Sequence, residues 1–248
     1  MAQGGDVILQ IPRLPSRWGV ELRGDAADVE QAAYLFNENT QISIQSGITS
    51  DPSATVLIAR EFEVLSSARD VHDAAQRIVD FLNGILFVDD SARRPISTGG
   101  IHEQRPDGTW IIATVCASAQ VVLRGVSARG IVAGQSSAQP HQTLWMEVGL
   151  KNGAVADVLT YLRAKPDWFD LYKAYEVMTR DVGRKNAHGP KWPNDIDVFR
   201  RDAQLHRHSR EWCLRQRIRT EGSMTLEEAS RLVRAMAQVW LQWKCHRV

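Results

Sequence analysis

Arginine and histidine side chains gather in one short stretch, residues 195–219, where the chain offers the residue types best suited to phosphate chemistry. An arginine holds a phosphate through a planar, permanently charged fork. A histidine is the side chain best suited to move a proton near neutral pH. The stretch therefore indicates a surface that binds or cleaves a phosphodiester. Its candidate site residues are Arg201, Asp202, His206, Arg207 and His208.

The same stretch is also typical of a solvated amphipathic helix, and helical periodicity alone does not choose between the two interpretations. On an ideal helix Arg201, Leu205 and His208 lie on one side, and His206 is rotated from His208 by roughly half a turn. We expect Leu205 to point inward and a neighbouring face to carry the active groups. Either Arg201 with His206, or Arg207 with His208, is then the functional pair.

The composition is that of a globular protein whose two halves differ in charge. Of the 248 residues, 44% are hydrophobic and 24% are charged, which excludes a disordered chain. Residues 1–150 hold 11 Lys/Arg and 17 Asp/Glu, a balance of −6, whereas residues 151–248 hold 19 and 12, a balance of +7. This asymmetry predicts two units. The basic half suits a polyanionic partner, the acidic half of the same chain, or the acidic half of a second copy.

No cofactor, metal or membrane signal stands out in the sequence. The three cysteines, Cys116, Cys213 and Cys245, form neither a disulfide framework nor a zinc signature. The glycine-containing segments match neither a phosphate loop nor a dinucleotide fingerprint. No apolar run reaches membrane-spanning length, and the N-terminus lacks the pattern of a secretion signal. We therefore expect no cofactor, no metal, no membrane contact and a cytoplasmic location.

Strand and helix patterns alternate in the first half, which predicts a mixed α+β unit with mostly antiparallel strands. A capping pattern at Ser67–Asp70 begins a helix that Asn83-Gly84 should end. Pro106-Asp107-Gly108 is typical of a hairpin turn. A further helix is expected at 25–37. Strands are expected at 7–11, 18–23, 42–45, 54–64, 96–105, 109–118 and 119–126.

The second half lacks strand patterns and predicts a bundle of about four helices with short connections. A polar, proline-containing segment at 135–142 is the expected linker. Thr225 to Glu228 forms a capping box for the last helix. The other helices are expected at 143–150, 154–165, 167–182 and from 195 onward. The predicted fold is thus α+β, with an α+β domain at 1–135 of sensor or regulatory role and a helical bundle at 143–248.

The basic helix resembles the signature of HEPN domains, small helical bundles found in bacterial defence and toxin systems. That signature is an arginine, a polar residue, three variable residues and a histidine, matched here by Arg201-Asp202-Ala203-Gln204-Leu205-His206. Residues 201–208 also satisfy a longer spacing of the same family. The motif lies late in a helical unit and precedes a terminal helix, as in that family. The resemblance covers residues 143–248.

The resemblance implies a metal-independent endoribonuclease in which two protomers bring their Arg/His motifs together in a dimer cleft. Arg201 would stabilise charge on the phosphate, His206 or His208 would move the proton, and Asp202 would orient the histidine or the arginine. RNA, a second copy and a protein trigger or regulator are the implied partners. The alternative is a non-catalytic HEPN-like module that dimerises or binds nucleic acid or protein.

A second likeness is local. Lys191-Trp192-Pro193-Asn194-Asp195 matches a segment of biotin protein ligases. In that family the segment ends a strand, whereas here the preceding residues 184–190 are polar and the basic helix follows. We interpret it as a proline-containing turn in which Asn194 or Asp195 caps the next helix.

Overall fold

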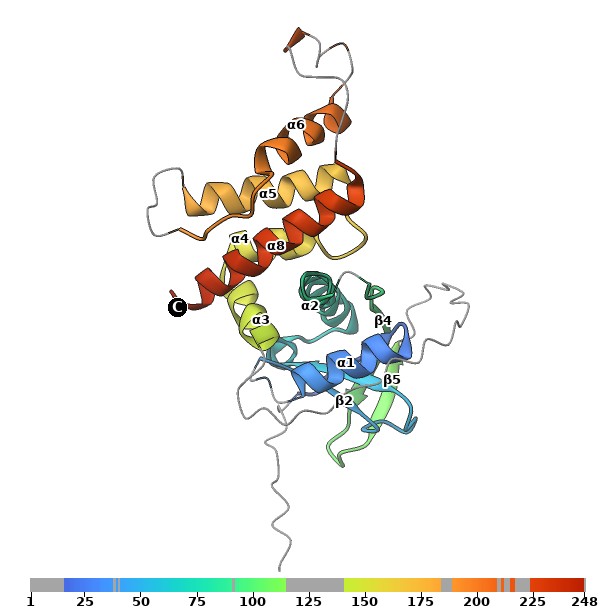
Figure 1. The fold of residues 1–248 in the computed structure, drawn as a ribbon. Helices are drawn as coiled ribbons and strands as arrows, with labels where there is room; N and C mark the ends of the chain where they lie inside the picture. The colour runs from blue at the N-terminus through green and yellow to red at the C-terminus, as the bar shows by residue number, and fades with distance from the viewer. Residues whose placement is uncertain are drawn as a thin grey trace, which may run out of the picture.

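The computed structural model is of mixed α+β class, with a five-stranded antiparallel sheet and seven α-helices in the residues that it describes. The sheet lies at one end of the molecule and a helical bundle at the other (Figure 1). The order of the predicted fold, strands first and helices later, is therefore seen. The described residues are 16–37, 39, 41–90, 92–114, 141–183, 189–208, 211, 215–216 and 224–247.

Five strands form the sheet in the order β2-β3-β1-β4-β5, and every neighbouring pair is antiparallel. One apolar row crosses four strands, because the register places Ile44 opposite Leu57, Leu57 opposite Val20 and Val20 opposite Ile101. Residues paired in this way share a face of the sheet, so the row builds one wall of the core. The strands are β1 (Trp18–Arg23), β2 (Ile42–Ser46), β3 (Thr55–Ala59), β4 (Ser97–Gln104) and β5 (Trp110–Thr114).

Of the seven predicted strands, five are found, one of them shortened, and two lie outside the described residues. The β4–β5 hairpin is confirmed, and Gly108 takes the left-handed backbone conformation, φ 85°, that its turn requires. The strand predicted over 54–64 ends early, because a 3-10 helix, η1 (Arg60–Val64), replaces its second half. In η1 Phe62 is fully buried and Val64 is 85% exposed. The strands predicted at 7–11 and 119–126 lie outside the described residues.

Helices α1 (Ala26–Phe36) and α2 (Ala68–Asp89) pack on the sheet, α1 along β2 and α2 across β1 and β4. Local capping explains where both begin. The Asp25 carboxylate accepts a hydrogen bond from the Ala27 amide, and the Ser67 hydroxyl accepts one from the Asp70 amide. Both starts agree with the sequence predictions.

The predicted end of α2 at Asn83-Gly84 is wrong, because both residues serve tertiary contacts inside the helix. The Asn83 side chain bonds both the backbone N–H and the carbonyl of Ile96, which leads into β4. A Cβ on Gly84 would lie 2.3 Å from the carbonyl oxygen of Leu159 in α4. A helical glycine that permits close backbone approach carries no stop signal, so α2 continues to Asp89.

Five helices make up the described part of the second half. Helix α3 begins two residues earlier than predicted, so His141 and Gln142 belong to a helix and not to the linker, whose other residues lie outside the described part. The capping box of Thr225 and Glu228 is confirmed at the start of α8. The helices are α3 (His141–Lys151), α4 (Gly153–Tyr161), α5 (Trp168–Val182), α6 (Ile196–Arg207) and α8 (Leu226–Cys245).

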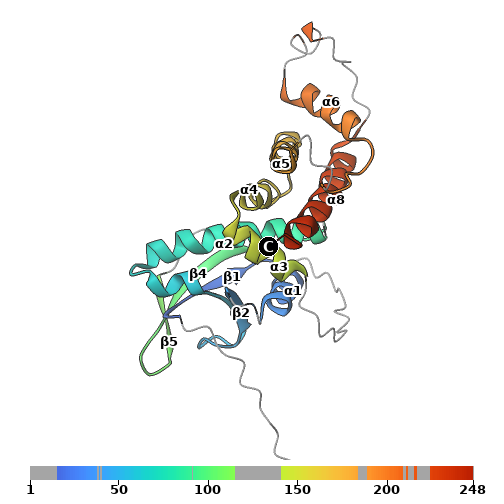
Figure 2. The ribbon, with the colours of Figure 1, turned by 90° about the vertical axis from the view of Figure 1, so that its left-hand side faces the viewer.

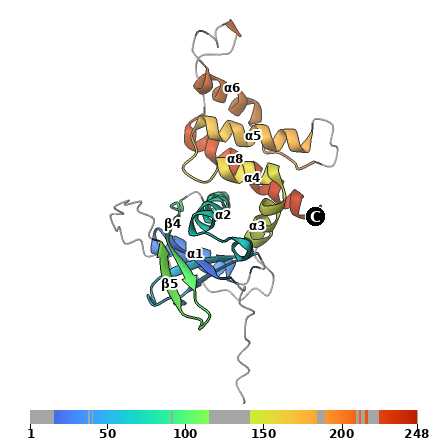
Figure 3. The ribbon, with the colours of Figure 1, turned by 180° about the vertical axis from the view of Figure 1, so that it is seen from behind.

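Helix α2 joins the two halves, since it contacts the sheet on one side and α3, α4 and α8 on the other. Figures 2 and 3 show it between the sheet and the bundle from two further directions. The buried apolar residues form one continuous cluster from the sheet through α2 into the bundle. Helix α6 lies at the far end of the bundle and packs chiefly on α5.

Candidate functional site

The face that α6 turns toward α5 follows helical spacing from its first turn to its last. Phe199, Asp202 and Ala203 are fully buried, and His206 continues the same i, i+3, i+4, i+7 stripe. We had expected Leu205 to point inward, but it is only half-buried. The inward stripe is therefore offset by one residue from the predicted one, and it ends in the histidine of the motif.

Asp202 is a buried carboxylate with two well-defined partners. One oxygen accepts a hydrogen bond from Arg201 Nε at 2.8 Å, and the other accepts one from the Met224 backbone N–H at 2.7 Å. Its side chain has no exposed surface, whereas that of Arg201 is 30% exposed. Burial of a carboxylate requires this kind of pairing. Asp202 therefore holds Arg201 and ties α6 to the start of α8.

His206 stacks on Trp168 at the open end of the α5–α6 pair. The two ring centroids are 4.4 Å apart and the ring planes differ by 8°. Trp168 in turn lies near Phe199, with centroids 6.2 Å apart and planes 19° apart. His206 is nevertheless exposed, because this is the last turn of α6 and the first turn of α5. An aromatic stack thus restricts the imidazole while leaving it accessible.

Arg207 lies over the Tyr172 ring, with its guanidinium carbon 3.9 Å from the ring centroid. The Tyr172 hydroxyl accepts a hydrogen bond from Gln204 Nε2 at 2.9 Å, which fixes the tyrosine from α6 itself. Phe169 is 51% exposed, and two cations lie within 6 Å of its ring, Arg207 at 5.8 Å and Lys173 at 5.6 Å. Such distances are those of cation–π contacts.

These side chains form one aromatic–basic surface from two helices. Helix α5 supplies its aromatic rings and one amine, and the last turn of α6 supplies the imidazole and the guanidinium. We define the aromatic–basic surface as Trp168, Phe169, Tyr172, Lys173, His206 and Arg207. It combines flat apolar rings with positive charge, the combination that binds unpaired bases and phosphates.

The five predicted site residues fall into three groups. Arg201 and Asp202 engage one another and the start of α8, whereas His206 and Arg207 contact the first turns of α5. His208 lies beyond the end of α6 at Arg207 and takes an extended conformation, φ −121° and ψ 159°. The ideal-helix placement of His208 beside Arg201 and Leu205 is therefore wrong. The pair brought to one surface is His206 with Arg207.

Sequence reasoning missed the aromatic rings that α5 contributes to this surface. It treated Trp168 as part of a buried stripe. In the structure Trp168 is only half-buried, and its ring contacts His206. A usable signal was present in the adjacent pair Trp168-Phe169. Successive helical residues point about 100° apart, so of two neighbouring aromatic residues at a helix start one can pack on the core while the other reaches solvent, as Phe169 does here.

Among the described residues, no three His, Cys, Asp or Glu side chains are grouped as metal ligands would be. No helix in the described ranges has both the length and the apolar composition that a membrane crossing needs. The chain matches no known family model, no curated protein and no solved structure.

Proposed function

We propose that the aromatic–basic surface binds RNA and that His206 and Arg207 cleave a bound phosphodiester without a metal ion. The observation that carries this proposal is the neighbouring pair of stacks, His206 on Trp168 and Arg207 on Tyr172. They place an accessible imidazole and an accessible guanidinium on adjacent residues, each oriented by a ring beneath it. This constellation has the groups that a phosphodiester cleavage requires.

Binding would use the rings for bases and the cations for phosphates. Phe169 offers the most exposed ring, and Lys173 and Arg207 flank it. Stacking of an unpaired base on an aromatic side chain contributes about 1–3 kcal/mol and tolerates any base. An A-form duplex keeps its bases stacked inside. The surface should therefore prefer single-stranded segments and loops to duplex RNA.

The cleavage step would be the internal attack that RNA permits. The imidazole of His206 removes the proton of a 2′-hydroxyl, whose oxygen attacks the adjacent phosphorus as the bond to the 5′ oxygen breaks. Arg207 stabilises the negative charge that develops on the phosphate oxygens. The imidazole keeps the proton of the 2′-hydroxyl, and the departing 5′ oxygen receives a proton from solvent. The products are a 2′,3′-cyclic phosphate end and a 5′-hydroxyl end.

Arg201 and Asp202, in the middle of α6, would support the reaction without taking part in proton transfer. Asp202 lies in the interior and is bound to Met224 N–H, and Arg201 is bound to Asp202. In this proposal Asp202 orients Arg201, and the bonds of Asp202 to Arg201 and Met224 hold α6 in place. As in the HEPN domains that the motif resembles, the active unit would be a homodimer of a defence or toxin-type effector. The α+β half would restrain it, with α2 as the shared element.

A second candidate function is RNA binding without cleavage. It is favoured by the pair of Arg201 and Asp202, because the charge of Arg201 already neutralises the buried Asp202 carboxylate. The two functions share one surface and differ only in whether His206 reaches a 2′-hydroxyl. A single set of variants can therefore separate them.

The test is incubation of the full chain with labelled single-stranded RNA and tRNA in EDTA, with binding and cleavage recorded together. Cleavage should leave cyclic phosphate ends, disappear in His206→Ala and persist in His246→Ala, which changes an exposed histidine at the end of α8. Binding without cleavage in the wild type would favour the second candidate. Equal RNA binding by the wild type and by a Phe169→Ala, Arg207→Ala double variant would contradict both.

A further inference from the structure

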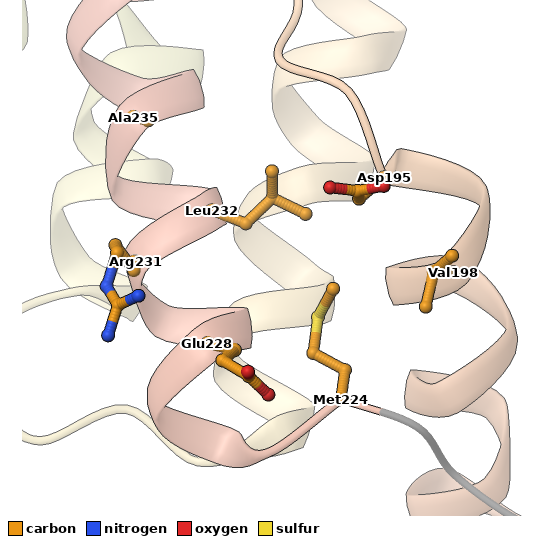
Figure 4. Close-up of a pocket in the computed structure, with 7 residues that line it drawn as sticks. All are labelled: Asp195, Val198, Met224, Glu228, Arg231, Leu232 and Ala235. Atoms are coloured by element: carbon orange, nitrogen blue, oxygen red, sulfur yellow. The ribbon is translucent and has the colours of Figure 1, made fainter.

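A groove of about 450 Å³ separates the first turn of α6 from the first turns of α8. Figure 4 shows α8 on one side of it and α6 on the other, with Met224 between them. Its walls are largely apolar, formed by Val198 on α6 and by Leu232 and Ala235 on α8. The volume lies within the range of small-molecule sites. The aromatic–basic surface uses none of these residues.

A part-buried hydrogen bond links the two sides of the groove. Met224 lines it, and the Met224 backbone N–H is bound to the buried carboxylate of Asp202 on α6. The Thr225–Glu228 capping box fixes the next turn of chain at the start of α8. Because both walls are anchored in this way, the groove is preformed and needs no rearrangement to accept a ligand.

Three charged residues line the groove, the carboxylates Asp195 and Glu228 and the guanidinium of Arg231. Arg231 is paired with Glu227 at 3.4 Å, and Arg200 is paired with Asp197 at 3.3 Å. The Glu228 carboxylate accepts hydrogen bonds from the Thr225 amide and hydroxyl, and the positive charge of Arg231 also acts on it. Hydrogen bonds from Thr225 hold the pKa of Glu228 below its ordinary value.

Asp195 supplies the second negative group at the rim. In the described part of the chain its carboxylate makes no capping hydrogen bond to α6. In Figure 4 it points toward Leu232 across the opening. Its backbone is left-handed, with φ 70°, whereas a capping residue is typically extended.

From this combination we infer that the groove is a binding site for a small organic ammonium ion with an apolar body. The apolar body would pack between Val198, Met224 and Leu232, and the ammonium group would lie beside Asp195. A small ligand fits better than a helix, because α6 contributes only its first turn to the groove. The inference does not depend on RNA binding.

The experiment uses the full chain labelled with ¹³C at the methionine methyl groups, titrated with 4-phenylbutylamine, 4-phenylbutanol and 4-phenylbutanoate. Met224 reports on the groove, and the buried Met146, Met178 and Met236 report on the intact fold. We expect the amine to shift the Met224 signal saturably and to bind about two- to fivefold more tightly than the alcohol, as for a partly exposed ion pair. The carboxylate should bind more weakly than the alcohol.

Two matched variants locate the charge. Asp195→Asn should make the amine and the alcohol equal, whereas Asp197→Asn, two residues along and 95% exposed, should keep the preference. Asp195→Gly gives a second test that also tolerates the left-handed backbone. An unmoved Met224 signal with all three compounds, equal affinities in the wild type, or equal effects of the Asp195 and Asp197 changes would overturn the inference.

Discussion

The imidazole of His206 lies parallel to the indole of Trp168, 4.4 Å away, although 38 positions separate the two residues in the chain. The stack joins the last turn of α6 to the first turn of α5. It gives His206 its orientation, while Asp202 on the same helix binds Arg201 and the Met224 N–H. The indole therefore serves as the positioning group of the proposed RNA site.

Trp168→Ala should weaken binding of a single-stranded RNA by about 1–3 kcal/mol, because it removes a ring and frees the imidazole stacked on it. Fluorescence anisotropy with a labelled oligonucleotide measures the change. Trp168→Phe keeps a ring under His206 and should recover most of the affinity. Unchanged affinity in Trp168→Ala would show that the stack has no part in RNA binding.

Asp202→Ala should lower the free energy of unfolding by about 1–3 kcal/mol, because it leaves the Met224 N–H without its buried acceptor. It also removes the partner of Arg201. Urea unfolding followed by circular dichroism measures the difference. Asp197→Ala on the same helix is the control, and because Asp197 is 95% exposed the change should stay within about 0.5 kcal/mol. Similar effects of the two substitutions would contradict the structural role of Asp202.

Gly84→Ala should destabilise the fold by about 1–3 kcal/mol, because its methyl group would lie 2.3 Å from the Leu159 carbonyl and force α2 and α4 apart. Gly153→Ala is the matched control, since a methyl group there meets no atom within 4 Å. Thermal unfolding of both variants provides the comparison. A Gly84→Ala protein as stable as the wild type would mean that α2 and α4 do not approach so closely.

Stability should fall below neutral pH because of His102, a β4 residue that is only 6% exposed. Burial lowers the pKa of His102 below its ordinary value of 6.5, although the nearby Glu21 carboxylate acts to raise it. The unfolded chain therefore binds the proton more readily than the folded one. The free energy of unfolding should be constant above about pH 7 and decrease as the pH falls through 6.5, by at most about 1.4 kcal/mol per unit.

Urea unfolding at pH 7.5, 6.5 and 5.5 measures this decrease, and His102→Leu should reduce it. The range stays above the acid region in which Glu21 titrates. Burial acts to raise the pKa of Glu21, but the Arg23 side chain and the Gly100 amide bond it and keep it below its ordinary value. His72→Leu, on α2, is the matched histidine-to-leucine control. The same slope in wild type and His102→Leu would contradict the assignment.

Local signals in the sequence were sufficient at three places where one turn of chain determines the outcome, but not at the start of α6, where the predicted cap Asp195 makes no side-chain capping hydrogen bond. The Thr225–Glu228 capping box, the start of α2 after Ser67 and the hairpin turn at Pro106–Gly108 were all predicted and are all found. In each case the hydrogen bonds that define the element join residues a few positions apart. The same reasoning failed at Gly84, because the contact that explains this glycine comes from Leu159.

The sequence by itself therefore determined the α+β class, most helix starts and a basic helix that carries Arg201, Asp202, His206, Arg207 and His208. Only the tertiary structure decided which of them share a surface. Burial of Asp202 against Met224 and stacking of His206 on Trp168 join residues that are 22 and 38 positions apart. Helical periodicity orders residues within α6, but the packing of α5 and α8 against it determines which of them are buried and which reach solvent.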